Sequence, residues 1–387
     1  MSGITSPVQI PLYIFPVPEG DGFKIGIKVS FDNKNFLMYE FDTGGSGFWA
    51  AGNNNWWPKS MYTVPPDSSP QTINYSSGIQ YTGEPVITEV YFENGLSIST
   101  TVSRITNAIN KSNNAKKDKA FDSAWAHALT ETSPEKPPLW GHFFGDFGMS
   151  LAPFTDKTSG TEWFFGILPQ LLPPPPSGGA TPAMLNGYII NLNASSSYIQ
   201  IGLAPSDIDN FTLYTMQAPS PDTQPFPSSN IPTYCEQLLT GYLELSPPEA
   251  PFSGNEIGIV FDTGAPSAEI HTDASNAALS TISISALEPY LVNDIVYSGE
   301  SGKTQSSVKP NTGFALTSGS NTILQFPVGS ESGTNAVSAT TLNLSSAGSG
   351  YVNAGLVPFF KGPVLYYFPF DGQGGYENGQ IGFPKQS

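Results

Sequence analysis

The tetrapeptide Phe-Asp-Thr-Gly occurs twice in the sequence, as Phe41-Asp42-Thr43-Gly44 and as Phe261-Asp262-Thr263-Gly264. The two copies lie 220 residues apart, and each follows an apolar run that is typical of a strand, NFLMYE and EIGIV. A single Asp-Thr-Gly is weak evidence, because these residues are common in turns. A motif that recurs once in each half of the chain indicates a duplicated architecture.

Each residue type in the motif has a physical role. An Asp that ends a strand lies on a turn that can face a cleft, and Gly permits this turn and leaves room beside the carboxylate. If a pseudo-twofold axis relates the halves, Asp42 and Asp262 meet there, share one proton and acquire separated pKa values. One carboxyl group then acts as general base on a water while the other polarises a carbonyl. This chemistry requires no metal and no other cofactor.

The composition predicts a β-rich protein with two lobes. The chain has 387 residues, with 39 Gly, 36 Pro and 12% aromatic residues, which suits many short strands joined by turns. Expected strands include Phe23–Val29, Val86–Phe92, Tyr188–Leu192 and Val364–Phe368. Lys116–Thr130 is rich in Ala and lacks Gly and Pro, and therefore predicts a surface helix.

Charge and hydropathy exclude several classes of partner. The net charge of −17 disfavours a nucleic acid, because phosphates would be repelled. No apolar run is long enough for a membrane span, and Met1–Gly20 lacks the pattern of a Sec-type signal peptide. With Cys235 as the only cysteine, the fold cannot depend on an internal disulfide. Nothing in the sequence indicates an interface, so a monomer is expected.

At these motifs the chain resembles the pepsin-like aspartic peptidases, and the resemblance runs nearly end to end. DTGGSGFW (residues 42–49) resembles the first catalytic loop of the family, and INYSSGIQYTG (73–83) resembles its flap hairpin. FGM (147–149) and AGL (354–356) are similar to the elements that thread the ψ-shaped loop of each lobe. VLYYF (364–368) and GQIGF (379–383) resemble the closing strands.

The resemblance implies an all-β fold, mainly β with short helices, in a bilobal double-ψ β-barrel architecture with pseudo-twofold symmetry. It implies an N-terminal lobe at 1–205, with the first catalytic loop and the flap, and a C-terminal lobe at 206–387 with the second loop. The implied activity is that of an aspartic endopeptidase that prefers hydrophobic residues around the cut and binds pepstatin-like inhibitors. Its partner would be a peptide or protein substrate.

The resemblance also implies roles for individual residues. Asp42 and Asp262 would be catalytic, and Trp49 would hydrogen-bond the flap tyrosine, Tyr75. The supporting residues would be Thr43, Gly44, Thr263 and Gly264, and the flap and substrate-binding residues would be Tyr75, Trp49, Ser77, Gly78, Ile79 and Ile270.

Both catalytic loops depart from the family pattern. Gly45 replaces the serine that normally bonds the first Asp, and Ala265 stands where a hydroxyl residue is expected. Loss of these donors predicts raised pKa values for the dyad and activity at milder pH. Glu40 lies two residues before Asp42, on the same side of the strand. It either raises the dyad pKa values further or is paired or solvated, and we favour the second alternative.

A second hypothesis is a catalytically silent protein on the same scaffold that acts as a binding or inhibitor protein. The missing hydroxyl donors favour it. Both Asp residues, both Thr-Gly pairs and Tyr75 oppose it, since silent relatives tend to lose one of these. Met1 and the lone cysteine resemble the bacterial, disulfide-free branch of the family. A cytoplasmic protein, or one exported without a Sec signal (an effector, for example), is therefore expected, with an extracellular mature form as the alternative.

Overall fold

The computed structural model describes residues 4–17, 22–75, 77–111, 115–131, 136–155, 162–176, 184–193, 195–218, 223–246, 251–272, 282, 284–292, 305–329, 335–341 and 350–385. All the predicted site residues belong to these ranges. Ser76, within the predicted flap, lies outside them.

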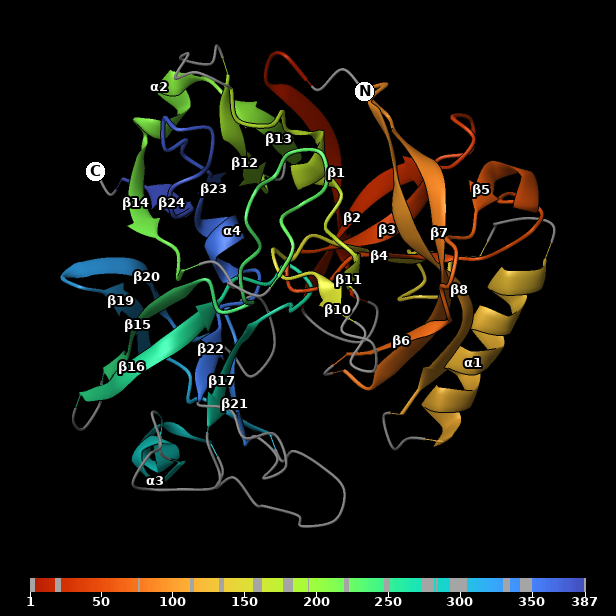
Figure 1. The fold of residues 1–387 in the computed structure, drawn as a ribbon. Helices are drawn as coiled ribbons and strands as arrows, with labels where there is room; N and C mark the ends of the chain where they lie inside the picture. The colour runs from red at the N-terminus through yellow and green to blue at the C-terminus, as the bar shows by residue number, and fades with distance from the viewer. Residues whose placement is uncertain are drawn as a thin grey trace.

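The described residues form mainly strands with a few short helices, as the composition predicts. The helices are α1 (Ala115–Thr130), α2 (Pro205–Ile208), α3 (Ile284–Leu287) and α4 (Val357–Lys361), with short 3-10 turns at Lys59–Met61, Leu168–Leu171 and Glu288–Tyr290. The chain forms two lobes, one built from the first part of the sequence and the other from its second half (Figure 1). The predicted mainly β, two-lobed fold is therefore confirmed.

The larger sheet has 14 strands and contains strands from both halves of the sequence. Its order is β14-β24-β23-β12-β13-β1-β2-β3-β9-β4-β8-β7-β5, and β6 pairs with β7. The strands are β1 (Val8–Pro16), β2 (Phe23–Ser30), β3 (Leu37–Asp42), β4 (Phe48–Ala51), β5 (Tyr62–Thr63), β6 (Gln71–Asn74), β7 (Ile79–Phe92), β8 (Ser97–Asn110), β9 (Gly145–Gly148), β12 (Leu185–Asn191), β13 (Tyr198–Leu203), β14 (Phe211–Thr215), β23 (Val364–Tyr367) and β24 (Gln380–Pro384).

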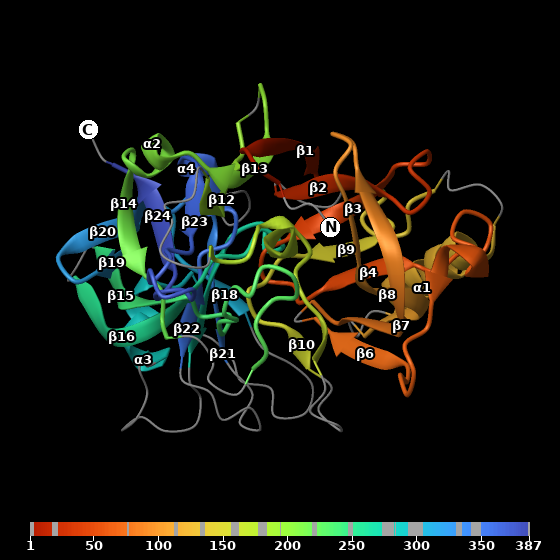
Figure 2. The same ribbon diagram turned by 45° about the horizontal axis from the view of Figure 1, so that its top comes forward.

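The second sheet belongs to the C-terminal half alone and has the order β18-β21-β17-β22-β16-β15-β19-β20. Its strands are β15 (Leu239–Ser246), β16 (Phe252–Val260), β17 (Ala268–Thr272), β18 (Gln305–Ser307), β19 (Gly313–Ser318), β20 (Asn321–Pro327), β21 (Val337–Thr341) and β22 (Tyr351–Asn353). A separate pair joins β10 (Phe154–Thr155) to β11 (Glu162–Phe164). Because β23 and β24 pair into the larger sheet, the two halves are continuous there, and the lobe boundary after residue 205 stays a prediction (Figure 2).

The same strand arrangement occurs around both Asp-Thr-Gly motifs. In the first half, β3 runs parallel to β9, β4 is antiparallel to β9, and β8 is parallel to β4. In the second half, β16 runs parallel to β22, β17 is antiparallel to β22, and β21 is parallel to β17. The order and the directions are the same, so each motif leaves an equivalent strand of a repeated unit.

The helix predicted at Lys116–Thr130 is present as α1, with one additional residue at its start. Trp125 on α1 is almost fully buried, and its ring lies 5.1 Å from that of Tyr81 in β7. This aromatic contact holds α1 against the β7–β8 hairpin (Figure 1). None of the helices in the described ranges is long and apolar enough to cross a membrane.

Candidate active site

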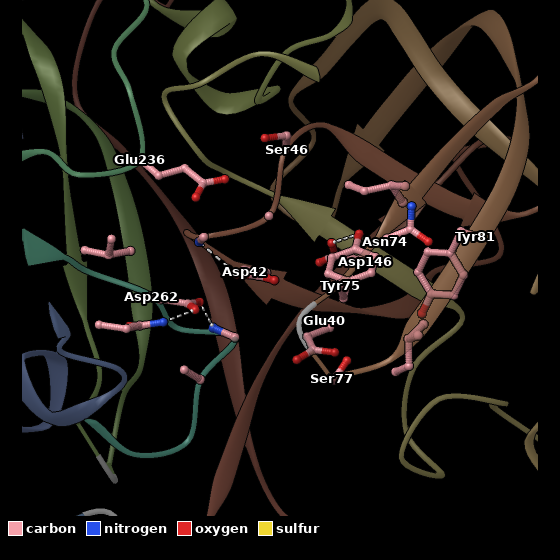
Figure 3. Close-up of a pocket in the computed structure, with 18 of the residues that line it drawn as sticks. Glu40, Asp42, Ser46, Asn74, Tyr75, Ser77, Tyr81, Asp146, Glu236 and Asp262 are labelled. Atoms are coloured by element: carbon pink, nitrogen blue, oxygen red, sulfur yellow. Dashed lines mark hydrogen bonds between the residues drawn. The ribbon is translucent and has the colours of Figure 1, made fainter. Parts of the chain in front are cut away.

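A cleft of about 1020 Å³ lies between the two lobes, and both Asp-Thr-Gly motifs lie on its floor. Asp42 comes from the end of β3 and Asp262 from the turn that follows β16 (Figure 3). The cleft is acidic, because Glu40, Asp146, Glu236 and Glu269 also line it. Among the described residues, no group of three or more His, Cys, Asp or Glu side chains is placed to hold a metal ion.

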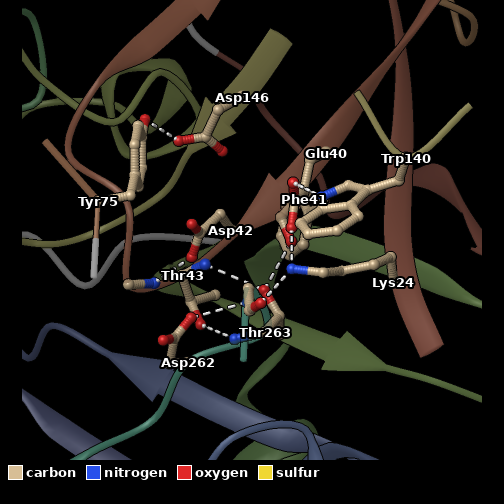
Figure 4. A network of polar contacts seen from close by, with 12 residues as sticks. Lys24, Glu40, Phe41, Asp42, Thr43, Tyr75, Trp140, Asp146, Asp262 and Thr263 are labelled. Carbon is tan, nitrogen blue, oxygen red and sulfur yellow. Dashed lines mark hydrogen bonds and ion pairs between the residues drawn. The ribbon is translucent and has the colours of Figure 1, made fainter. Parts of the chain in front are cut away.

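A crossed pair of threonines ties the two motifs together. Thr43 Oγ1 donates to the carbonyl oxygen of Phe261, and Thr263 Oγ1 donates to that of Phe41, each at 2.7 Å. The backbone N–H of Thr43 donates to Thr263 Oγ1 at 3.0 Å, and that of Thr263 donates to Thr43 Oγ1 at 2.9 Å (Figure 4). Four reciprocal hydrogen bonds therefore fix the two loops in a symmetric arrangement.

Gly44 and Gly264 place the two carboxyl groups side by side. The N–H of Gly44 donates to Asp42 Oδ1 at 2.8 Å, and that of Gly264 donates to Asp262 Oδ1 at 2.7 Å. A Cβ on Gly44 would lie 2.6 Å from Asp262 Cγ, and one on Gly264 would lie 2.5 Å from Asp42 Cγ. Each carboxyl group thus occupies the space beside the opposing glycine, which no other residue type leaves open.

Burial raises the pKa of Asp42 well above its usual range, and the neighbouring carboxylates of Asp262 and Asp146 raise it further. A hydrogen bond with Asp262 acts in the same direction. Asp42 therefore retains a proton at a pH at which an ordinary Asp is ionised. This direction agrees with the hypothesis of activity at milder pH.

The expectation that both carboxyl groups lack an outer donor is wrong for Asp262. Asn353 Nδ2 donates to Asp262 Oδ2 at 2.8 Å. Asn353 ends β22, so an amide from the adjacent strand compensates for the missing hydroxyl at Ala265. The sequence alone did not reveal this donor, because it lies 91 residues away along the chain.

The predicted flap is the hairpin between β6 and β7, and it borders the cleft. The N–H of Tyr75 donates to the carbonyl oxygen of Ile79 at 2.8 Å, and the N–H of Gly78 donates to that of Tyr75 at 3.0 Å. Gly78 has a φ of 92°, a left-handed conformation that favours glycine. Tyr75, Ser77, Gly78 and Ile79 all line the cleft.

The predicted hydrogen bond between Trp49 and Tyr75 is wrong. Tyr75 Oη donates to Asp146 Oδ2 at 2.5 Å, whereas Trp49 Nε1 donates to the carbonyl oxygen of Ser46 at 3.0 Å. Trp49 is fully buried in β4, where its ring packs against Phe164. The indole N–H of Trp49 is thus used within its own loop, and the hydroxyl of Tyr75 donates to the carboxyl group of Asp146 instead.

Ile270, predicted as a pocket residue, is fully buried in β17 and does not belong to the residues that line the cleft. Its neighbour Glu269 lines the cleft instead. Because side chains alternate along a strand, a shift of one residue moves a side chain from the cleft to the core.

Glu40 is paired, which agrees with the favoured prediction that it is paired or solvated. Lys24 Nζ lies 2.5 Å from Glu40 Oε1, and Trp140 Nε1 donates to Glu40 Oε2 at 3.1 Å (Figure 4). Lys24 also donates to the carbonyl oxygen of Gly264, so it joins β2 to the loop of the second Asp-Thr-Gly motif. The sequence did not reveal Lys24 or Trp140, since neither belongs to a motif.

Replacement of Lys24 by Met is expected to destabilise the protein by about 3–5 kcal/mol, because it leaves the Glu40 carboxylate buried without its cation. Lys28→Met is the matched control, since the ion pair between Lys28 and Glu93 is partly exposed and exposed pairs contribute about 0–1 kcal/mol. Urea unfolding of both variants measures the difference. Equal losses of stability would contradict the proposed role of Lys24.

Asp146 is a third buried carboxyl group beside the dyad, and it lies in β9 with an exposed fraction of 2%. Burial and the charge of Glu40 raise the pKa of Asp146, although the hydrogen bond from Tyr75 and the charge of Lys24 act in the opposite direction. Its Oδ1 atom is buried and has no hydrogen-bond partner among the described residues. Asp146 was not predicted as a site residue. A polar residue directly before the Phe147-Gly148 element could have indicated that it faces the site.

The pKa shifts predict that the folded protein is less stable at neutral pH than in mild acid. Asp42 and Asp146 hold protons more tightly in the folded chain than in the unfolded one, so stability decreases as the pH rises above the ordinary value of 3.8. Asp146→Asn cannot ionise and is expected to raise the melting temperature at pH 7 by about 2 °C or more, with a smaller change near pH 4. Thermal unfolding at both pH values measures this, and an equal shift at both would contradict it.

Comparisons with known proteins add a similarity in fold. No protein-family model matches the sequence, and no curated protein matches it. Among solved structures, the chain is similar to the crystal structure of an aspartic proteinase from Irpex lacteus, with 12% sequence identity, a TM-score of 0.45 and coverage of 98% of each chain. At this low identity and TM-score, the function has to be inferred from the geometry of the site.

Proposed function

We propose that the protein is a pepsin-like aspartic endopeptidase in which Asp42 and Asp262 activate one water molecule. The observation that carries the proposal is the reciprocal pair of threonine hydrogen bonds, which brings two carboxyl groups from equivalent strands together on the floor of a cleft. Two carboxyl groups in contact cannot both ionise, so the pair holds one proton. Such a pair supplies a general base and a general acid at one point.

The asymmetry of the two carboxyl groups indicates their starting roles. The raised pKa of Asp42 favours its protonated form, whereas Asp262 accepts hydrogen bonds from the amide of Asn353 and from the N–H of Gly264. In the proposed reaction, the Asp262 carboxylate takes a proton from the water as the water oxygen bonds to the scissile carbonyl carbon. Asp42 gives its proton to the carbonyl oxygen. The C–N bond then breaks as Asp262 gives its proton to the amine nitrogen and Asp42 takes back the proton of one hydroxyl group on the former carbonyl carbon, which leaves a carboxylic acid and an amine and restores the single proton of the dyad.

The cleft suits an extended peptide. The flap provides backbone groups that can pair with a substrate strand, as in β-strand addition. Ile73, Ile79 and Phe154 line the same cleft and favour hydrophobic side chains around the cut. We propose that the protein acts on unfolded proteins or peptides as a monomer.

Incubation of the pure protein with a denatured protein substrate from acid to neutral pH tests the proposal. Cleavage is expected between hydrophobic residues, at a less acidic optimum than that of a gastric enzyme, and a pepstatin-like inhibitor is expected to block it. Mass spectrometry of the products identifies the new termini. If no cleavage occurs at any pH, the proposal is wrong and the silent binding scaffold is favoured.

A further inference from the structure

The repeated strand arrangement places two polar residues at equivalent positions. Asp146 in β9 pairs with Glu40 in β3, and Asn353 in β22 pairs with Val260 in β16. Glu40 and Val260 each lie two residues before the Asp of their motif. Asp146 therefore has the same place beside Asp42 that Asn353 has beside Asp262.

Asn353 shows what a residue at this position does. Its Nδ2 atom donates to Asp262 Oδ2 at 2.8 Å, while its Oδ1 atom accepts the N–H of Gly355 at 2.9 Å. The second bond fixes the orientation of the amide, so that its N–H points at the carboxyl group. Asn353 thus supplies the donor that Ala265, directly after the motif, cannot supply.

The first half has the same deficit, and Gly45 lies between the carboxyl groups of Asp42 and Asp146. Gly45 follows its motif as Ala265 follows the other, and it has no side chain. A Cβ on Gly45 would lie 2.7 Å from Asp146 Oδ2 and 2.9 Å from Asp42 Oδ2. One oxygen of each carboxyl group therefore flanks the position that a side chain at residue 45 would take.

A carboxyl group donates a hydrogen bond only when it is protonated. The surroundings of Asp146 favour that form, because it is buried, its Oδ1 atom has no partner among the described residues, and Lys24 is engaged with Glu40 and Gly264. The titratable groups that interact with Asp146 are Asp42, Asp262, Glu40, Lys24, Tyr75 and Tyr81.

We propose that Asp146 is a positioning residue that stays protonated during turnover and donates a hydrogen bond to the outer oxygen of Asp42, directly or through one water. Asp146 would thus supply a hydrogen-bond donor to Asp42, as Asn353 supplies one to Asp262, and the absence of a side chain at Gly45 allows the approach. Because Asp146 also accepts the hydroxyl of Tyr75, it links the flap to the dyad. The kinetic part of this inference rests on the proposed function, whereas the protonation of Asp146 does not.

Two substitutions at residue 146 separate donation from packing. Asp146→Asn keeps a donor of the same shape, whereas Asp146→Leu removes it. The Leu variant is expected to lose kcat by about 10- to 100-fold with a small change in KM, because a hydrogen bond to a charged group is lost. The Asn variant is expected to keep at least about one third of kcat. The alkaline limb of the pH–rate profile of the Asn variant should lie at higher pH than that of the unmodified protein. In the unmodified protein, turnover stops when either the dyad or Asp146 loses its proton, whereas in the Asn variant only the dyad can lose one.

A double substitution provides the rescue. Gly45→Ser alone is expected to be nearly inactive, because its Cβ would lie 2.7 Å from Asp146 Oδ2. In an Asp146→Ala background, which removes this close contact, Gly45→Ser supplies a hydroxyl beside Asp42 and is expected to raise kcat about tenfold above that of Asp146→Ala alone. Gly45→Ala in the same background is the control, since it adds the methyl group without the hydroxyl and should not raise kcat.

Carbon-13 NMR of the Asp carboxyl groups tests protonation without any turnover. One signal, absent from Asp146→Asn, is expected to titrate well above the ordinary value of about 3.9. If this signal is present in a protein that cleaves nothing, the proposed function fails and the protonation of Asp146 stands. A signal that titrates near the ordinary value overturns the inference. Equal kcat losses for the Asn and Leu variants in an active enzyme also overturn it.

Discussion

Asp42→Asn and Asp262→Asn are each expected to reduce peptide hydrolysis by a factor of about 10³ or more. General acid and base catalysis contribute factors of about 10² to 10⁴, and either substitution removes one partner of the shared proton. The loss should appear in kcat, because the cleft that holds the peptide is unchanged. Rates of cleavage of one fluorogenic peptide by the three proteins measure the effect.

The folded state provides the control for these variants. Asn has the shape of Asp, and the pKa of buried Asp42 is already raised, so Asp42→Asn should fold and gain stability at neutral pH. Both variants should retain the thermal unfolding transition of the unmodified protein or exceed it. Activity within about tenfold of the unmodified protein in either variant would contradict the dyad mechanism.

Gly264→Ala is expected to have the second largest effect, with a loss of activity of about 100-fold or more and a destabilisation of about 1–3 kcal/mol. Its Cβ would lie 2.5 Å from Asp42 Cγ and from Asp42 Oδ2. The backbone cannot move away easily, because Thr263 is hydrogen-bonded to the opposite loop and Gly264 accepts a bond from Lys24. Asp42 must then leave its position beside Asp262.

Gly329→Ala is the matched control for Gly264→Ala, because its Cβ would meet Asn335 at an ordinary distance of 3.4 Å. Its activity and stability should change little. Urea unfolding and peptide cleavage of both variants measure the two effects. A Gly264→Ala protein that remains fully active would show that the carboxyl groups need not pack against the opposing glycines.

The sequence by itself determined the features that depend on residues close to one another along the chain. The strands, the helix α1 and the position of each Asp at the end of a strand follow from local hydrophobic patterns and helix propensity. The repeated tetrapeptide also predicted that Asp42 and Asp262 meet. A pseudo-twofold rotation relates the two copies of a duplicated unit, and residues close to that axis lie next to each other. The crossed bonds of Thr43 and Thr263 have the expected symmetry.

Only the tertiary structure decided which distant side chains complete the site. Tyr75 bonds Asp146 rather than Trp49, Asp262 accepts an amide from Asn353, and Lys24 reaches Glu40 and a carbonyl 240 residues away. These contacts depend on strand register and on how the two halves pack together. A shift of one residue in a strand exchanges a cleft residue for a core residue, and no local pattern fixes that register across so many residues.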